Sequence, residues 1–538
     1  MCAKAMKTPL LARTSCGFLG AFALLLIGSP ARAEEPKKAS EPRVLEEPGE
    51  VTTVVDAFDD ADPFDLTITL GYQHSWKSAN IQRETWIDQP GLSTGGYTAD
   101  TLNVAAYSES TSRLNTRVDV GLYHDIALYL RMPIVLSNSR ELKGLDGSDK
   151  VQSVVLTSAA GEQLFSLPFS SPKRSGIEYL AVGIDADLMN QARDPTKPTW
   201  LFGVEGRFNV SEPMHACNSS TAGLNQPGPQ VKCAYPSDVN RNGRAGDTSF
   251  TDGNGDTWQL EGTQNGERKP GVSRGVTGLE VHTIVSRRVK YVEPYGGFRA
   301  LFEFPTSSSD FGLTDLEGSL VNHPPLEGWL ILGIQVIPWE NREQFQRLTF
   351  DARFQGSYRS EGRDYSELFD ALGSSDAPSI RRPNYASYMR NPDPVTGNPY
   401  LADGVTPNPN YAPSVVDLSS QKVYFTGLTD VQAHGTFTAM GSATWQAGEY
   451  VKFQIGAGYT FVQGHFITMD QPCNPDIKND VSRSGPCRNI SNVGGVSTSS
   501  STGVPNPNYR PTINHVGRRF KADDASVVDL WVNGIVMF

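Results

Sequence analysis

The sequence predicts an all-β fold, a transmembrane antiparallel β-barrel of about 12 strands. Three observations support this prediction. Apolar and polar residues alternate along many stretches, short and long connections alternate between them, and no apolar run suits a membrane-spanning helix. The longest charge-free apolar run, 17–27, is shorter than the roughly 18 residues that such a helix needs. The mean hydropathy of −0.36 resembles that of a soluble protein, but it also fits a barrel, which exposes only alternate residues to lipid.

The clearest predicted hairpin covers residues 112–135, with a tight turn at 123–125. Period-two alternation places one set of side chains on each face of a strand. Here one face is apolar and the other carries charge. The apolar set is Leu114, Thr116, Val118, Val120 and Leu122 before the turn, and Ile126, Leu128, Leu130 and Met132 after it.

The same alternation predicts strands along the rest of the chain, and the connections between them alternate in length. A transmembrane barrel has short periplasmic turns and long extracellular loops, whereas a β-sandwich has no reason for this asymmetry. The predicted strands are 65–76, 103–122, 126–137, 177–189, 199–210, 277–287, 291–304, 329–339, 347–359, 433–446, 450–463 and 526–538. The short connections are 123–125, 190–198, 288–290, 340–346 and 447–449, and the long ones are 77–102, 138–176, 211–276, 305–328, 360–432 and 464–525.

The N-terminus has the pattern of a secretory signal peptide. Basic residues precede the apolar run 17–27, and Ala31 and Ala33 fit the small-x-small cleavage rule. An uncleaved anchor is the alternative. The residues that follow are acidic and proline-rich, and they form either a disordered lead-in or a plug inside the barrel. The predicted organisation is a signal peptide at 1–33, a periplasmic segment at 34–64 and a barrel at 65–538.

The charge of the mature chain argues against nucleic-acid binding. Cleavage removes four basic residues and no acidic ones, so the net charge falls from −12 to −16, with 43 Lys and Arg against 59 Asp and Glu. Phosphate backbones attract basic patches, and no basic block is present.

Four cysteines remain after cleavage, in two close pairs within stretches rich in Pro, Gly, Asn and Ser. Cys217 lies near Cys233, and Cys473 lies near Cys487. In an oxidising compartment such pairs predict local disulfides in the long loops. A zinc site would need CxxC spacing or nearby His ligands, and only His215 is near.

The last predicted strand carries the most specific local pattern. Leu530, Val532, Val536 and the terminal Phe538 share one face, and polar residues fall on the other. This pattern resembles the C-terminal signature of bacterial outer-membrane β-barrel proteins. The resemblance covers about ten residues locally, and the rhythm of strands and loops extends it over most of 65–538. It implies an architecture, a place in the lipid of the cell outer membrane and recognition by the barrel-assembly machinery. It implies no substrate.

The polar face of the predicted strands is strongly charged. Charged side chains cannot face lipid cheaply, so we expect them to line the lumen, where they either set the selectivity of a wet passage or pair and hold the barrel shut. Twelve strands enclose a narrow interior. The predicted lumen-lining residues are Arg117, Asp119, Arg131, Asp185, Asp187, Glu205, Arg207, Glu293, Arg299, Glu303, Arg347, Asp351, Arg353 and Lys452.

The stretch 238–256 resembles the first half of a calcium-binding loop. Asp238, Asn240 and Asn242 offer oxygen ligands at alternate positions before a glycine, but Ser249 stands where a bidentate Glu belongs. Asp247 is a candidate for the missing carboxylate. The alternative is an Asn- and Gly-rich turn without metal. No cofactor is otherwise predicted.

Enzyme motifs are poor, and we predict that the chain is not an enzyme. The stretch 91–95 matches the spacing of a nucleophile elbow, but it lies between predicted strands rather than before a helix. A membrane-embedded lipid hydrolase would need a His–Ser pair facing the membrane, and no spacing along the sequence supplies one.

Three functions remain open at this level. The leading hypothesis is an outer-membrane channel, porin-like, that passes small solutes through its charged lumen. The second is a surface structural or binding protein that acts through disulfide-stiffened loops, and the third is the lipid hydrolase. The sequence does not define the solute, the openness of the lumen, the oligomeric state or the strand count to better than two.

Overall fold

The computed structural model defines the architecture of one compact unit, Leu45–Phe538, to which all described residues belong. The structure describes residues 51–55, 57, 65–88, 97–146, 164–220, 230–233, 249–251, 257–259, 269–306, 309–312, 321, 323–375, 377–381, 403, 405–406, 416, 425–469, 487–489, 501–505 and 519–538.

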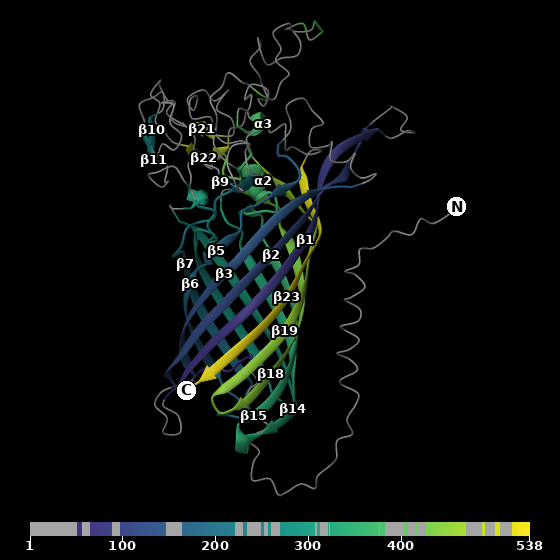
Figure 1. Ribbon diagram of the computed structural model, residues 1–538. Coiled ribbons are helices and arrows are strands. Elements are labelled where there is room, and N and C mark those ends of the chain that lie inside the picture. The colour runs from purple at the N-terminus through teal and green to yellow at the C-terminus, as the bar shows by residue number, and fades with distance from the viewer. Residues whose placement is uncertain are drawn as a thin grey trace, which may run out of the picture. The chain divides into compact units, whose positions relative to one another are not determined.

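Twelve long antiparallel strands form the body of this unit (Figure 1). The number equals the predicted one, and every predicted strand overlaps an observed one. The strands are β1 (Leu66–Asp88), β2 (Tyr97–Tyr123), β3 (Ile126–Gly144), β6 (Leu180–Met189), β7 (Thr199–Phe208), β12 (Val276–Ser286), β13 (Val292–Pro305), β14 (Glu327–Asn341), β15 (Gln346–Arg359), β18 (His434–Gly448), β19 (Val451–Val462) and β23 (Phe520–Met537).

The sheet closes on itself because the last strand pairs with the first. β23 runs antiparallel to β1 from the pair Thr67 and Met537 onwards. Beyond that pair, the backbone N–H of Leu66 donates to the carbonyl of Phe538 at 3.1 Å, and that of Phe538 donates to the carbonyl of Leu66 at 2.8 Å. Each remaining strand pairs with its neighbours in chain order, so the ring has no unpaired edge.

The outer surface of the ring is apolar along its length. In β3, Leu128 and Leu130 are 37% and 44% exposed, whereas Ala127 and Tyr129 between them are almost fully buried. The same alternation runs along the other strands. A continuous exposed apolar surface of this kind is stable only in contact with lipid, so it marks the membrane-facing side. None of the helices in the described part of the chain is long and apolar enough to cross a membrane.

Exposed aromatic residues gather where the strands end, as in the interfacial girdles of membrane barrels. The exposed aromatic residues near strand ends include Trp200, Trp339, Trp445, Tyr291 and Tyr450. Trp329 also lies near a strand end, but it is half-buried and faces the interior, because it shares the inward face of β14 with the buried Ile331.

Four adjacent strands, β1, β2, β3 and β23, extend well beyond their predicted bounds at the end opposite the short turns. We call this the loop end, and we call the end with the short connections the turn end. The extensions were not predicted because the apolar residues move from the outward face to the inward face of the same strand. Leu70 and Trp76 of β1 face outward, whereas Ala79 and Ile81 are buried inside.

The loop end holds a hydrophobic core that fills part of the barrel mouth. Inward residues of the four extended strands pack there against the connecting segments, with Leu164, Leu368 and Phe425 almost fully buried. The smaller elements in these connections are β4 (Phe169–Ser170), β5 (Arg174–Ile177), β8 (Cys217–Ser220), β9 (Gln230–Cys233), β10 (Ser249–Thr251), β11 (Thr257–Gln259), η3 (Asp310–Gly312), β16 (Gly362–Asp364), α2 (Phe369–Gly373), α3 (Pro378–Arg381), β17 (Thr429–Val431), β20 (His465–Thr468), β21 (Cys487–Asn489) and β22 (Ser501–Pro505), with η5 (Arg342–Gln344) at the turn end.

The lipid-facing surface gives the first prediction. We expect Leu70→Arg to lower the free energy of unfolding by about 2–4 kcal/mol, because it places a cation against hydrocarbon. Gln73→Arg is the matched control, since Gln73 faces inward on the same strand and already hydrogen-bonds Asp529 at 3.0 Å. Both effects are measured by denaturant titration of the barrel folded in lipid vesicles. Equal destabilisation by the two variants would contradict the assignment of the outer face.

Candidate functional site: the charged interior and the loop-end cavity

The charged residues of β2, β3, β6, β7 and β12 form a connected network on the inward face. Arg117 donates from Nε to Asp119 and from Nη2 to Asp185, each at 2.8 Å. Because β2 and β6 are both neighbours of β3, the second bond crosses an intervening strand. His282 Nε2 lies 2.9 Å from the same Asp185 carboxylate. The network thus joins side chains from three separate hairpins.

A second part of the network centres on Glu205, which is 2% exposed. Arg131 ion-pairs with Glu205, and Arg207 Nε donates to it at 2.7 Å. Arg207 also ion-pairs with Glu280, and Arg299 Nε lies 3.9 Å from Glu280. The acidic groups are therefore buried and shared between basic ones.

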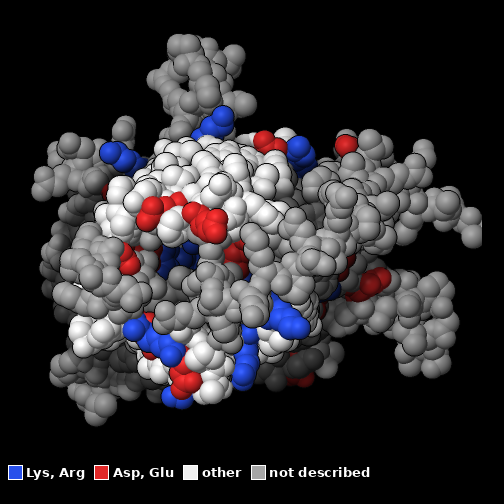
Figure 2. Space-filling view, turned by 90° about the horizontal axis from the view of Figure 1, so that it is seen from below, with Lys and Arg blue, Asp and Glu red and all other residues white. Residues whose placement is uncertain are grey.

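The arginine side chains remain partly accessible inside the closed ring. The side chains of Arg117, Arg131 and Arg299 are 36%, 30% and 30% exposed, while the outer surface of their strands is apolar. Arg117 packs over the Tyr129 ring at 3.9 Å, and Arg299 packs over the Trp329 ring at 4.2 Å. Viewed from the turn end, Lys and Arg side chains are visible in the hollow that the strands surround (Figure 2).

The other predicted lumen residues have separate contacts. Arg353 Nε donates to Tyr295 Oη at 2.8 Å, and Tyr295 Oη donates to Asp351 at 2.7 Å. Glu303 forms an ion pair with Arg274 at 2.7 Å, and Arg347 lies 4.0 Å from Glu340. Lys452 is 8% exposed. Asp187 has one buried carboxylate oxygen without a hydrogen bond.

Two members of the network are absent from the predicted set, although a local signal points to both. Glu280 and His282 alternate with Leu279 and Val281 in β12. Applying the same-face rule along the whole predicted strand would have included them. Their acceptors and donors could not be predicted, because strands far apart in the sequence supply them.

At the turn end, part of the segment before the barrel enters the interior. Thr52 is fully buried, and its hydroxyl lies 2.8 Å from Ser286 Oγ and 3.5 Å from Glu293 Oε1. Ala57 exchanges two backbone hydrogen bonds with His124 in the turn between β2 and β3. Of the segment 34–64, the structure describes 51–55 and 57, and these contacts belong to them.

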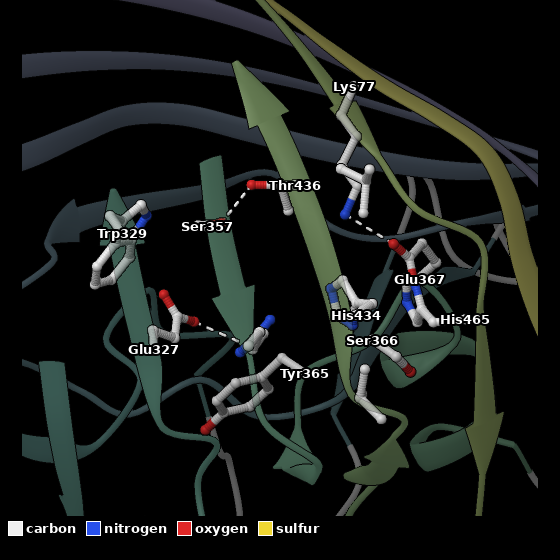
Figure 3. A pocket seen from close by; sticks show the side chains of 13 residues that line it. Lys77, Glu327, Trp329, Ser357, Tyr365, Ser366, Glu367, His434, Thr436 and His465 are labelled. Carbon is white, nitrogen blue, oxygen red and sulfur yellow. Dashed lines mark hydrogen bonds and ion pairs between the residues drawn. The ribbon is translucent and has the colours of Figure 1, made fainter. Parts of the chain in front are cut away.

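A polar cavity of about 260 Å³ lies at the loop end, between the inward faces of the strands and the connecting segments. Figure 3 shows Glu327 and Trp329 on one side and Lys77, Glu367 and His465 on the other. The lining residues are Lys77, Glu327, Trp329, Ser357, Arg359, Tyr365, Ser366, Glu367, Val431, His434, Thr436, Val462 and His465. None of these was predicted as a site residue, because segments that are far apart in the chain supply them.

Opposite charges are paired in the cavity wall. Lys77 Nζ lies 2.8 Å from Glu367 Oε1, and Arg359 Nε lies 3.0 Å from Glu327 Oε1. Burial opposes the ionisation of Glu367, but Lys77 and His465 outweigh it and hold the pKa of Glu367 at about 2. Glu367 is therefore an anion at every physiological pH. The wall carries two cations and two anions.

His434 and His465 stand side by side at the cavity, with ring centroids 4.0 Å apart and planes 12° from parallel. Their Nδ1 atoms lie 2.8 Å and 3.0 Å from the carbonyl oxygens of Gln432 and Gln463. Burial lowers the pKa of His465 below its usual value, although Glu367 acts in the opposite direction. His465 is therefore neutral near pH 7.

The loop end is braced by a buried ion pair and a disulfide. Arg174, whose side chain is 1% exposed, donates from Nη1 to Asp370 at 3.0 Å and also ion-pairs through Nη2. The backbone N–H of Cys217 donates to the same carboxylate at 2.9 Å. The predicted Cys217–Cys233 disulfide is confirmed, with a Cα–Cα distance of 3.9 Å. One carboxylate thus fixes α2 to two other connecting segments.

Two further predictions depend on residues outside the described ones. Cys473, the predicted partner of Cys487 in β21, is not described, and neither are the calcium ligands Asp238, Asn240, Asn242 and Asp247. Within the part of the chain that the structure describes, no group of three or more His, Cys, Asp or Glu is arranged to hold a metal ion.

Strand pairing also creates a His–Ser contact that no spacing along the sequence revealed. On the outward side of β1, His74 Nδ1 lies 2.8 Å from Ser112 Oγ, and His74 Nε2 lies 3.2 Å from Ser110 Oγ. No carboxylate contacts this ring among the described residues. The neighbouring backbone N–H groups belong to the β-ladder, so they cannot form an oxyanion hole.

Comparison of the sequence with protein-family models and with curated proteins gives no match. Among solved structures, the chain is similar to an outer-membrane channel from Pseudomonas putida F1, with 8% identity, 91% of this chain and 99% of that chain covered, and a TM-score of 0.30. It is also similar to a FadL homologue from Pseudomonas aeruginosa, with 7% identity, 88% of this chain and 90% of that chain covered, and a TM-score of 0.29. A third similar structure is the CymD monoaromatic hydrocarbon channel, with 7% identity, 88% of each chain covered and a TM-score of 0.28. Likenesses this weak do not assign an activity or a substrate.

The fold itself defines the class of protein. A closed ring of antiparallel strands, apolar outside and charged inside, is the architecture of bacterial outer-membrane β-barrels. The chain is an outer-membrane β-barrel protein.

The buried brace gives the second prediction. We expect Asp370→Asn to destabilise the loop end by about 3–5 kcal/mol, because it leaves Arg174 buried without a counter-charge. Hydrogen exchange of α2 should accelerate, while the strands in the membrane keep their protection. Asp194→Asn, in an exposed turn, is the control and should change neither. Unchanged exchange in α2 would show that the ion pair does not hold it.

Proposed function

We propose that this protein is a channel that passes small polar or amphipathic solutes across the outer membrane. The observation that carries the proposal is the partial exposure of charged side chains inside a ring whose outer surface is apolar. A barrel interior filled by packed side chains would bury its guanidinium groups. Arg353 is 29% exposed there, and Arg117, Arg131 and Arg299 are exposed to a similar extent. Accessible charge in that place supports a water-containing passage.

The ion pairs can contribute to solute selectivity as well as to the stability of the barrel. Buried carboxylates hold the arginines in fixed positions, and a fixed array of guanidinium groups can select among solutes in a narrow passage. A closed structural barrel would need the same ion pairs, but it would not need accessible arginines. On this proposal the partners are the lipid around the apolar surface and a small solute inside.

Ion selectivity gives the third prediction. We expect Arg353→Glu to shift the reversal potential of the channel in planar bilayers toward cation selectivity, because it replaces an accessible cation in the passage by an anion. Arg193→Glu is the control, since Arg193 lies in a turn and is 40% exposed. A refolded barrel without conductance or solute flux would contradict the channel. Conductance with unchanged selectivity would remove Arg353 from the passage.

We also propose that the segment around Thr52 narrows the turn end of this channel. Thr52 is fully buried between the inward faces of β12 and β13, where it contacts Ser286 and Glu293. A solute that crosses the barrel along β12 and β13 would meet this segment, which is bound at the turn end by the backbone bonds of Ala57 to His124. Among the alternatives for the acidic N-terminal segment, these contacts favour the plug.

A cross-link tests the plug and gives the fourth prediction. The hydroxyls of Thr52 and Ser286 are 2.8 Å apart, so we expect a Thr52→Cys, Ser286→Cys double variant to form a disulfide when oxidised. Conductance should then fall at least fivefold and return on reduction, because the disulfide retains in the passage a segment that must move aside when solute crosses. The two single variants control for the substitutions themselves. Equal conductance of the oxidised and reduced double variant would contradict the proposed role of this segment.

A binding role for the loop end is the second candidate. The Cys217–Cys233 disulfide and the buried Arg174–Asp370 pair support a rigid surface there, and rigid loops on a barrel suit recognition. Reduction of the disulfide distinguishes the two functions. A binding protein should lose affinity for its partner, whereas a channel should keep its conductance.

A further inference from the structure

The loop-end cavity presents two hydrogen-bond acceptors, Nε2 of His434 and Nε2 of His465, to which no group of the described residues donates. We propose that it binds a small neutral solute rich in hydroxyl groups, a polyol or a monosaccharide, whose hydroxyls donate to Nε2 of His434 and His465. This inference rests on the proposed channel function, because it names the class of solute that the channel recognises.

The acceptors follow from the hydrogen bonds on the other side of each ring. A carbonyl oxygen can only accept, so Nδ1 of both histidines carries the proton that it donates to Gln432 or Gln463. A neutral imidazole then has a bare lone pair on Nε2. Two protonated rings stacked at 4.0 Å would repel one another, which favours the neutral state of the pair. His434 and His465 are 6% and 4% exposed, so the cavity is the place where their Nε2 atoms find donors.

The charges in the wall argue against an ionic solute. Lys77 is paired with Glu367, and Arg359 is paired with Glu327. An ion would have to break one of these pairs or remain uncompensated, and either event is costly away from water. An anion would also face the two imidazole lone pairs. A neutral hydroxyl donor meets neither obstacle, and its oxygen can accept from Lys77 or Arg359 in return.

The shape and the aromatic lining agree with a compact ring or short polyol. Trp329 and Tyr365 line the cavity, and the Arg299 guanidinium packs over the Trp329 ring at 4.2 Å. An indole ring supplies a flat apolar surface for the C–H face of a sugar. The volume of about 260 Å³ lies below the range of roughly 300–1,000 Å³ typical of drug-sized ligands. A solute of monosaccharide size therefore fits.

Binding to the full-length purified barrel in detergent micelles tests the inference. Glucose, sorbitol and myo-inositol are titrated by calorimetry, and permethylated glucose is the control ligand because its hydroxyls are capped. We expect at least one of the three polyols to bind and the capped sugar not to bind. His465→Phe and His434→Phe keep a ring in the stack but remove the acceptor, so each should weaken binding at least tenfold. His74→Phe, on the outer surface, should leave binding unchanged.

The pH dependence provides a second readout. Groups that face the histidine pair are Lys77, Arg359 and Glu367, and burial of His465 keeps its pKa below the usual value. Polyol binding should therefore keep at least half of its affinity from pH 8 to pH 6.5, because a ring with a lowered pKa stays mostly neutral over this range. A larger loss would show that a ring becomes protonated and would overturn the proposed acceptor role.

The outcomes separate this inference from the channel proposal. Failure of all three polyols to bind, equal binding of the capped sugar, or normal binding by both Phe variants overturns the hydroxyl-recognition site even if the barrel conducts. Variants that fail to refold, as judged by heat-modified mobility in electrophoresis, are replaced by His465→Leu and His434→Leu, which also lack an acceptor and for which the same tenfold loss is expected. A barrel that binds a polyol but conducts nothing keeps the site and overturns the channel.

Discussion

Closure of the sheet is the constraint on which the rest of this structure depends. In hydrocarbon there is no water to satisfy backbone N–H and carbonyl groups, so every strand must pair on both sides. The pairing of β23 with β1 completes that requirement. Once the ring is closed, period-two geometry allows only two environments for a side chain, lipid outside or the interior inside. The apolar belt and the charged interior are two consequences of the same closure.

The interior charges are positioned by closure as well. Arg117 reaches Asp185 across β3, and Arg207 reaches Glu280 on the adjacent strand, because neighbouring strands bring side chains of one face within reach. Carboxylates such as Glu205 are almost fully buried, while the guanidinium groups remain accessible. This asymmetry leaves mainly cations accessible in the network, although the chain as a whole is acidic. The channel that we propose would therefore present its solutes with a charge that the net charge of the protein does not suggest.

At the loop end the apolar residues face inward instead of outward, because the strands there extend beyond the lipid. β1, β2, β3 and β23 continue past the belt and turn their apolar residues inward, where they cover connecting segments. Asp370 joins α2 to Arg174 and to Cys217, so segments with little regular structure are held in fixed places. The cavity with His434 and His465 lies where these segments oppose the strand faces. Trp329 joins the proposed recognition site to the charged interior, because it lines the cavity and contacts Arg299 of the network.

The sequence by itself determined the features that depend on local order. Alternation located all twelve membrane strands and separated their two faces, and close spacing predicted the Cys217–Cys233 disulfide. The tertiary structure alone decided which side chains meet. The pairing of Lys77 with Glu367, the stacking of His434 on His465 and the entry of Thr52 between β12 and β13 join segments far apart in the chain. The inward turn of Trp329 and the extensions of the four long strands also required it. Alternation shows only that successive side chains lie on opposite faces of a strand. Whether a face contacts lipid or protein depends on how the segments inside the ring pack against it.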